Sequence, residues 1–378
     1  MIVKIADNIT SPLGLTTEEN FKAVLSGKSM LEIHEDAFGL PEPFCGSLFN
    51  EAFTSGTIPE EAEDTKDLSF LERLCVYSAS KAMNECNVDA SRNDVLFVIS
   101  TTKGNVGLLA SDRMDKRCYL AYSADRVTEY FKNPNKPIVV SNACVSGVCA
   151  QITAVRELLG GQYKYAVVIG CDVLSKFIIS GFQSFKALGS GQCKPYDRNR
   201  DGLNLGEAAG TIILESTDDP SPDVWHYAGS SIHNDANHIS GPSRTGEGSY
   251  RVLTDILKNI DKSELAFINA HGTATAYNDE MESIAIHRAG LDEVPLNGLK
   301  GTYGHTLGAA GVIETVLSMK AIDNSIILPT KGYEEQGTSH ELNISNQKRE
   351  TNKKAFIKIL SGFGGSNAGI AYRKGGVL

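Results

Sequence analysis

The sequence predicts an α/β fold with parallel strand pairing, and three observations lead to this prediction. Short apolar runs of the kind that form buried strands recur along the chain, at 95–100, 137–142, 165–170, 210–215, 265–270 and 355–360. Segments with the apolar spacing of helices occupy 67–86, 146–159, 248–259, 279–289 and 308–323. The two kinds of segment alternate, which is typical of a parallel sheet covered by helices.

The N-terminal segment, MIVKIADNIT, predicts a strand that leads into a loop, without the charged start and apolar stretch of a signal peptide. No run of about 18 apolar residues occurs, so no membrane-spanning segment is expected. The 378 residues are 41% hydrophobic and 22% charged, as in a soluble globular protein with a sizeable core. The net charge of -10 argues against nucleic acid as the main partner.

The cysteines indicate the redox environment. Eight are scattered along the chain and none forms a CxxC pair, at positions 45, 75, 86, 118, 144, 149, 171 and 193. Several lie within apolar strand or helix patterns. We therefore expect reduced thiols in a cytoplasmic protein rather than a disulfide framework.

A polar segment, STDDPSPD at 216–223, predicts the boundary between an N-terminal half, 1–216, and a C-terminal half, 217–378. The two halves contain similar turns, NACVSG around Cys144 and YGHTLG around His305. Each turn has a glycine three positions after its reactive residue and then opens a helix with apolar spacing. The halves are therefore expected to be duplicated units, although strand–turn–helix joints often look alike.

Cys144 is the first candidate for chemistry, because it lies where a predicted buried strand turns into a helix. The unpaired N–H groups and positive dipole end of that helix favour thiolate over thiol. The same turn can place the Cys144 amide where it stabilises an oxyanion. A small buried cysteine at a packing point is the alternative that this segment leaves open.

Two histidines are the next candidates. His271 follows the strand predicted at 265–270, and His305 precedes the helix predicted at 308–323. Each is flanked by a glycine, which permits tight turns and close backbone approach, so we expect functional side chains at both positions. His233 and His238 match no known metal motif, and no metal site is expected.

The segment ILSGFGGSNAGIAY follows the last predicted strand and brackets Phe363 with glycines. Such a loop can direct a backbone N–H into a cavity. It has no lysine and no following amphipathic helix, so it does not predict a phosphate loop.

Taken together, these motifs resemble the β-ketoacyl-carrier-protein synthases of the thiolase superfamily. The resemblance covers nearly the whole chain, most closely about 95–371, and rests on five motifs in order: NACVSG, YDRNRDGLNLGEAAG, NAHGTATAYND, KGTYGHTLGAAGVIE and GFGGSNAG. It implies a thiolase fold, in which two similar halves with mixed five-stranded sheets stack in αβαβα layers. The implied reaction is a decarboxylating Claisen condensation of an acyl thioester with malonyl-carrier protein to give 3-oxoacyl-carrier protein, in fatty-acid, polyketide or polyene biosynthesis.

The resemblance also implies the roles of the central residues. Cys144 would be the acylated nucleophile, and its amide and that of Phe363 would form the oxyanion hole. His271 and His305 would donate hydrogen bonds to the thioester oxygen where enolate charge develops. Lys300 would be the active-site lysine, paired with Glu314.

Further residues are implied to handle the substrate. Thr273 and Thr275 would hydrogen-bond the phosphopantetheine arm that carries it, so no bound cofactor is expected. Phe363 would also gate the acyl pocket. The implied partners are an acyl carrier protein and a second subunit, in a homodimer or in a heterodimer with a synthase-like chain. The candidates for carrier docking are four basic residues, Lys66, Lys116, Arg117 and Arg200.

Three departures from the family pattern bear on specificity. Residues 276–278 are Ala-Tyr-Asn where the family usually has proline and glycine, which puts the shape of the pantetheine entrance in question. Val145 follows the nucleophile, and a β-branched residue there can reshape the acyl pocket. The N-terminal third is also shorter than in typical fatty-acid members. The sequence therefore assigns no acyl chain length.

The competing functions differ in the residues they need. A thiolase would have a second cysteine where Phe363 stands, and synthases that start from acyl-CoA have asparagine in place of His305. A silent polyketide subunit would lack Cys144. Three alternatives stay open: the active subunit of a ketosynthase/chain-length-factor heterodimer, a cysteine hydrolase that uses Cys144 and a histidine, and a binding scaffold.

Overall fold

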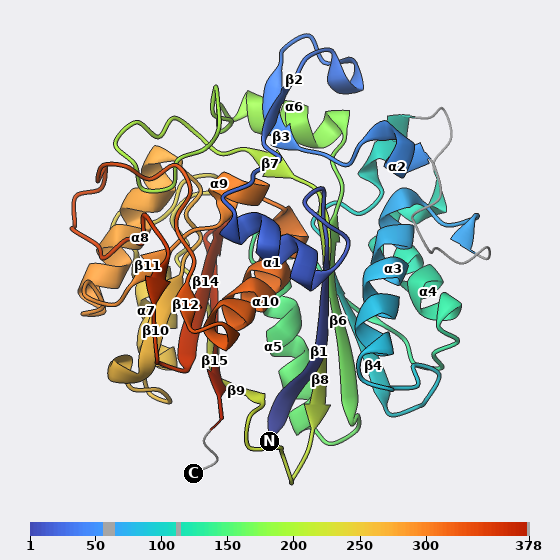
Figure 1. Cartoon of the computed structure of the whole chain (residues 1–378). Helices are drawn as coiled ribbons and strands as arrows, with labels where there is room; N and C mark the ends of the chain where they lie inside the picture. Colours follow the sequence, from blue (N-terminus) through green and yellow to red (C-terminus); the bar gives the residue numbers. More distant parts are fainter. Residues whose placement is uncertain (56–64, 111–114, 376–378) are drawn as a thin grey trace.

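The molecule consists of five layers, in which two mixed sheets alternate with three layers of helices (Figure 1). The computed structural model describes residues 1–55, 65–110 and 115–375. One sheet comes from the first half of the chain and the other from the second half. The predicted α/β class and the layered architecture are confirmed.

The two sheets have the same topology. The first has the spatial order β5 (Ile138–Val140), β4 (Val95–Ser100), β6 (Tyr165–Asp172), β8 (Ala208–Ser216) and β1 (Ile2–Thr10). The second has the order β11 (Leu296–Asn297), β10 (Leu265–Asn269), β14 (Ala355–Gly362), β15 (Ser366–Lys374) and β9 (Trp225–Asn234). In each sheet the first three strands of this order run parallel and the fourth is antiparallel to both neighbours. The similarity of the two turns therefore extends to two whole sheets.

Within the described residues, the two sheets join where β1 meets β9. β1 and β9 pair through the short antiparallel register Val3↔His226 and Lys4↔Trp225, so that ten strands form one hydrogen-bonded series. So short a ladder contributes little to stability by itself. The helices packed between the sheets supply most of the contact between the halves.

The middle layer consists of α5 (Ser146–Leu159) and α10 (Ala310–Asp323). Almost every residue of α10 is buried, as expected for a helix covered on all sides. The two helices nearly touch: a Cβ on Gly147 would lie 2.9 Å from the Gly311 Cα. Both helices begin just after a turn with a candidate catalytic residue, so this close crossing brings the two turns together.

The outer layers are α3 (Phe70–Asn84) and α4 (Leu120–Tyr130) on the first sheet, and α7 (Glu247–Ile256) and α8 (Ala276–Arg288) on the second. Other helical segments are α1 (Thr17–Leu25), α2 (Glu51–Ser55), α6 (Lys176–Ser184), α9 (Lys300–Tyr303), η1 (Ala37–Gly39), η3 (Val106–Ala110), η4 (Lys116–Cys118), η5 (Lys262–Glu264) and η6 (Leu307–Ala309). The remaining strands are β2 (Glu32–His34), β3 (Phe44–Ser47), β7 (Leu205–Gly206), β12 (Ile326–Ile327) and β13 (Arg349–Glu350). None of the described helices has the length and apolarity that crossing a bilayer requires.

All the segments expected from the apolar pattern form elements of the predicted type, with ends shifted by a few residues. The pattern missed the helices α1, α4 and α6, and the strands β9 and β15, which pair with each other along most of their length. Their sequences, WHYAGSSIHN and SNAGIAYRK, mix glycine and polar residues with apolar ones, and they become strands because each is held between neighbouring strands.

Candidate active site

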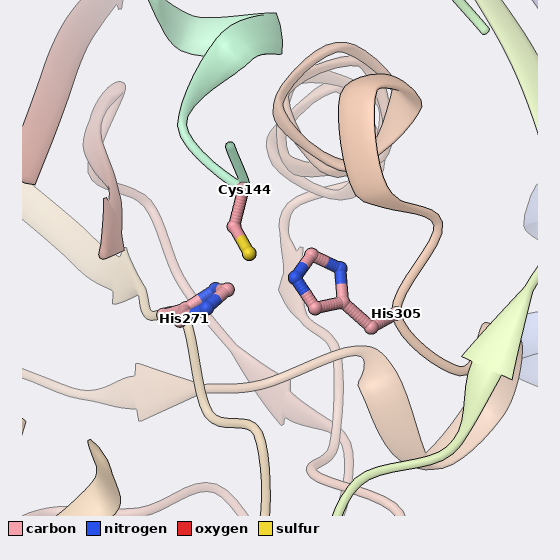
Figure 2. A group of neighbouring side chains, drawn as sticks. All are labelled: Cys144, His271 and His305. Carbon is pink, nitrogen blue, oxygen red and sulfur yellow. The ribbon is translucent and has the colours of Figure 1, made fainter. Parts of the chain in front are cut away.

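Cys144 lies in the turn between β5 and α5, just before the helix begins at Ser146. Ser146 closes this turn, since its hydroxyl accepts a hydrogen bond from the Asn142 N–H at 2.8 Å and donates one to the Ala143 carbonyl at 2.6 Å. Ala143 has a φ of 44°, a left-handed conformation that costs free energy for a residue with a Cβ. The strained turn directs the sulfur toward the two histidines (Figure 2).

Opposing influences act on the Cys144 thiol. Burial raises its pKa, while Lys300, the N–H of Phe363, Lys103 and the N–H of Cys144 itself lower it. Burial outweighs the others, and the pKa ends above its ordinary value. The expectation that the helix N-terminus would favour the thiolate therefore does not hold overall, because that expectation left out the loss of water around the sulfur.

His271 lies in the loop that follows β10, and a buried carboxylate holds that loop. Glu282 of α8 accepts hydrogen bonds from the backbone N–H groups of His271 at 2.7 Å and Gly272 at 2.8 Å. Asp279, one turn earlier on α8, accepts from Thr273 N–H at 2.9 Å in the same way. The loop is thus fixed through its backbone, which leaves the imidazole ring free to face the cavity.

His305 is held by a different set of contacts. Its N–H donates to the Asn204 carbonyl at 2.6 Å, and its carbonyl accepts from the Gly206 N–H at 3.0 Å. Its ring Nδ1 accepts a hydrogen bond from the Leu307 N–H at 3.1 Å. A neutral ring that accepts at Nδ1 carries its proton on Nε2, so His305 presents an N–H donor on that side.

The three side chains meet at one place. The Cys144 sulfur and one nitrogen of each histidine lie within 4.8 Å of one another, and the two rings meet edge to face at a centroid distance of 5.0 Å (Figure 2). Burial, followed by the charge of Lys300, lowers the pKa of both histidines well below the usual range, so both are neutral near pH 7. Within the described residues, His271 Nδ1 and His305 Nε2 are buried without a hydrogen-bond partner.

One thiol and two imidazoles are also a donor set that Zn²⁺ accepts. The buried ammonium of Lys300, whose charge already disfavours protonation of both histidines, equally disfavours a dication between them. The electrostatics of the site therefore favour negative charge at this position.

Two backbone N–H groups converge on the sulfur, those of Cys144 and Phe363. The Phe363 loop comes close because residue 362 is glycine: a Cβ there would lie 3.1 Å from the Cys144 nitrogen and 3.2 Å from the Ala143 Cβ. Both N–H groups lower the pKa of the Cys144 thiol, so both favour negative charge beside the sulfur.

A buried cluster of charges lies behind the histidines. Lys300 Nζ donates to Glu314 Oε1 at 2.9 Å, which agrees with the pairing that the resemblance implied. Burial alone would raise the pKa of Glu314, but the two neighbouring ammonium groups outweigh burial and lower it. The second of these groups is Lys358, which contacts Glu314 Oε2 and was not singled out from the sequence. The feature that could have identified it is a lysine within the apolar run AFIKIL.

The reactive side chains line a cavity of about 380 Å³. Thr273, Thr275 and Phe363 line it together with Cys144, His271 and His305. Lys300 and Glu314 are buried behind this wall. At the mouth, the Phe363 ring stacks on Phe182 at 5.9 Å and meets Phe185 edge to face at 5.5 Å.

The structure does not bring the four basic docking candidates to the cavity wall: Lys66, Lys116, Arg117 and Arg200 are absent from its lining. Two of them have other contacts, since Arg117 pairs with Asp115 and Arg200 donates to the Gly337 carbonyl at 2.6 Å. Lys186 lines the cavity and was not anticipated.

Comparison with known families and structures gives a consistent result. Residues 2–220 match the family described as "Beta-ketoacyl synthase, N-terminal domain", and residues 226–334 match "Beta-ketoacyl synthase, C-terminal domain". The "3-oxoacyl-[acyl-carrier-protein] synthase 2" of Vibrio harveyi is 24% identical, with 99% of this chain and 98% of the relative covered.

Among solved structures, a beta-ketoacyl synthase from Burkholderia phymatum superposes with a TM-score of 0.88 at 20% identity, covering 99% of both chains. The ketosynthase ApeO of Xenorhabdus doucetiae, solved in complex with its chain length factor ApeC, gives 0.84 at 22% identity, covering 99% of this chain and 98% of that one. At these identities the superpositions establish the fold.

Proposed function

The chain belongs to the β-ketoacyl synthase family and is a 3-oxoacyl-carrier-protein synthase of fatty-acid or polyketide synthesis, and from this premise we propose what its residues do. The reaction is a decarboxylating Claisen condensation. One observation carries the proposal: a sulfur nucleophile and two neutral imidazoles from distant parts of the chain lie within 4.8 Å of one another in a single cavity.

In the first step the acyl group moves from a carrier-protein thioester to Cys144. The sulfur attacks the acyl carbon, the bond to the carrier sulfur breaks, and the leaving thiolate takes up the proton that Cys144 gives up. The tetrahedral oxygen receives hydrogen bonds from the N–H groups of Cys144 and Phe363. The covalent intermediate divides one difficult condensation into two easier steps.

In the second step malonyl-carrier protein occupies the vacated pantetheine channel, where Thr273 and Thr275 hydrogen-bond the arm. His271 and His305 donate hydrogen bonds to the thioester oxygen as the carbon–carboxylate bond breaks and carbon dioxide leaves. The enolate carbon then attacks the acyl carbon and expels the Cys144 thiolate, which takes up one proton from the solvent. Neutral imidazoles suit this role, because the proton of each N–H stays on the ring while the oxygen gains charge.

Membership of this family also guides what we propose for the partners and for the division into two halves. We place the boundary between the halves at 216/217, so that the first half carries Cys144 and the second half both histidines. The carrier protein docks at the cavity mouth, in the cytoplasm, with no further cofactor than the pantetheine arm of its substrates. A second subunit, either another copy or a synthase-like chain, completes a dimer. The edge strand β5 supports this arrangement, because within the described residues it pairs with β4 alone.

The test is incubation with acyl-carrier protein and malonyl-carrier protein, followed by mass spectrometry. The wild type should carry an acyl adduct on Cys144 and release 3-oxoacyl-carrier protein. Cys144→Ala should form no adduct and still release carbon dioxide from malonyl-carrier protein, because both histidines remain. His271→Ala and His305→Ala should each lower that release by about 100-fold or more.

His340→Ala is the matched control, since His340 stacks on His287 outside the cavity and its loss should leave both steps unchanged. Wild-type decarboxylation by either active-site histidine variant would show that its assigned role is wrong. Release of free acid from acyl-carrier protein, without consumption of malonyl-carrier protein, would identify a cysteine hydrolase instead.

A further inference from the structure

Lys358 places a second ammonium group in the interior behind the active site. It lies in the middle of β14, paired with Asn269 of β10 on one side and Ile370 of β15 on the other, and its side chain is 0% exposed. The Nζ donates to the Ala270 carbonyl at 3.0 Å and to the Glu314 carboxylate. Burying a charge this completely is costly unless the charge is paired and hydrogen-bonded.

Among the three groups in direct contact, Lys300, Lys358 and Glu314, the charges do not cancel. The buried Glu282 carboxyl also acts on Lys358, but it hydrogen-bonds the backbone N–H groups of His271 and Gly272 rather than either lysine. Glu314 contributes one negative charge, and its two oxygens contact two different lysines, Lys300 and Lys358. Burial lowers the pKa of Lys358 to about 8, which still leaves it mostly protonated at pH 7. Lys300 alone would have neutralised the carboxylate, so pairing with Glu314 does not account for the additional buried cation.

The two ammonium groups affect the protonation of both active-site histidines. Lys300 and Lys358 both lower the pKa of His271 and of His305. The charged side chains that most lower the pKa of Cys144 are Lys300, which also acts on the histidines, and Lys103. Lys358 is therefore placed to affect the half of the reaction that uses the imidazoles.

Lys358 also reaches the His271 loop directly. Its hydrogen bond to the Ala270 carbonyl fixes the residue immediately before His271. The backbone N–H of His271 is fixed on the other side by Glu282. The loop is thus held between α8 and β14, and the Lys358 side chain supplies a hydrogen bond from the β14 side.

We propose that Lys358 is a positioning residue for the decarboxylation half of the reaction, which holds the His271 loop and adds one positive charge behind the two histidines. This inference rests on the proposed function. During decarboxylation the negative charge is conserved, and it moves from the malonyl carboxylate to the thioester oxygen that the histidines hold. A cation behind the histidines favours that movement, because it lies on the side where the charge arrives.

The first test compares the two half-reactions in Lys358→Met, which keeps an unbranched side chain one atom shorter and removes its charge. Decarboxylation of malonyl-carrier protein should fall about 10-fold or more. Acylation of Cys144 by acyl-carrier protein should stay within about threefold of the wild type, because the sulfur depends mainly on other groups. A general packing defect would lower both half-reactions together.

The second test restores the charge without restoring the lysine. In Lys358→Met the remaining Lys300–Glu314 pair has no net charge, whereas Glu314→Gln combined with Lys358→Met again leaves a positive charge, on Lys300, that no direct partner neutralises. The double variant should decarboxylate faster than the single variant. If the lysine merely filled space, removing a second buried partner would make the double variant slower.

Lys320→Met is the matched control, because Lys320 lies on the same helix as Glu314 but pairs with Glu18 at the surface. Should Lys358→Met fail to fold, Lys358→Gln keeps a donor for the Ala270 carbonyl without the charge, and the same split between half-reactions is expected. Wild-type decarboxylation by the folded variant, with an active parent enzyme, would overturn this inference alone. An inactive parent enzyme would overturn the proposed function instead.

Discussion

At the scale of single residues, the chemistry of this site depends on desolvation as much as on the identity of the side chains. The same burial raises the pKa of Cys144 and lowers the pKa of His271 and His305. Near pH 7 the site therefore holds a thiol and two neutral imidazoles rather than a thiolate–imidazolium pair. Thiolate character then arises during attack, with help from Lys300 and the two N–H groups at the sulfur.

This state of Cys144 can be tested by alkylation. Iodoacetamide reacts with the thiolate, so labelling of the Cys144 peptide should keep rising with pH above pH 8 rather than level off near neutrality. Lys300→Met removes the largest lowering influence on the pKa and should slow labelling at pH 8. Lys320→Met, a surface change, should leave the profile unaltered. A plateau below pH 7 would contradict a raised pKa.

At the scale of elements, the contact between α5 and α10 aligns the reactive turns. A Cβ on Gly311 would lie 2.4 Å from the Val148 nitrogen and 2.7 Å from the Gly147 carbonyl carbon. Both neighbours are backbone atoms of a buried helix, so neither can yield as a flexible side chain would. The glycines therefore set the distance between the helices, and with it the distance between the two turns.

Gly311→Ala should lower the free energy of unfolding by about 3 kcal/mol, because the central helices must move apart. The measurement is denaturant unfolding followed by circular dichroism. Gly181→Ala, in α6, is the control: a Cβ added there would have no neighbour within 4 Å, and alanine should stabilise this helix by about 0.5–1 kcal/mol. Equal stability of Gly311→Ala and the wild type would show that the central helices can yield at little cost.

At the scale of the whole molecule, the two halves share their interior. Val148 and Ile152 of α5 belong to the same apolar cluster as Phe267 and Phe356 of the second sheet. Val312 and Ile313 of α10 belong to a cluster with strands of the first sheet. Each central helix therefore packs against both sheets, the one of its own half and the one of the other half.

Because of this shared core, thermal unfolding should occur in a single cooperative transition, measured by calorimetry. The separate fragments 1–216 and 217–378 should not fold alone, since each would expose the apolar surface of its central helix. Co-expression of both fragments should restore a folded complex with decarboxylation activity. Two well-separated transitions, or a stable isolated fragment, would contradict the shared core.

The sequence by itself determined most of the strands and helices that frame the site, and the residue types within it. Apolar runs with different periods specify strands and helices locally, and each of the two histidines sits at a turn with an adjacent glycine. The tertiary structure decided what depends on many distant contacts at once: the meeting of Cys144 with the two histidines, the burial of Lys358, and the incorporation of β9 and β15 between other strands. It also decided the direction of each pKa shift, because desolvation is the sum of all the groups that exclude water from a side chain, and no local pattern in the chain contains that sum.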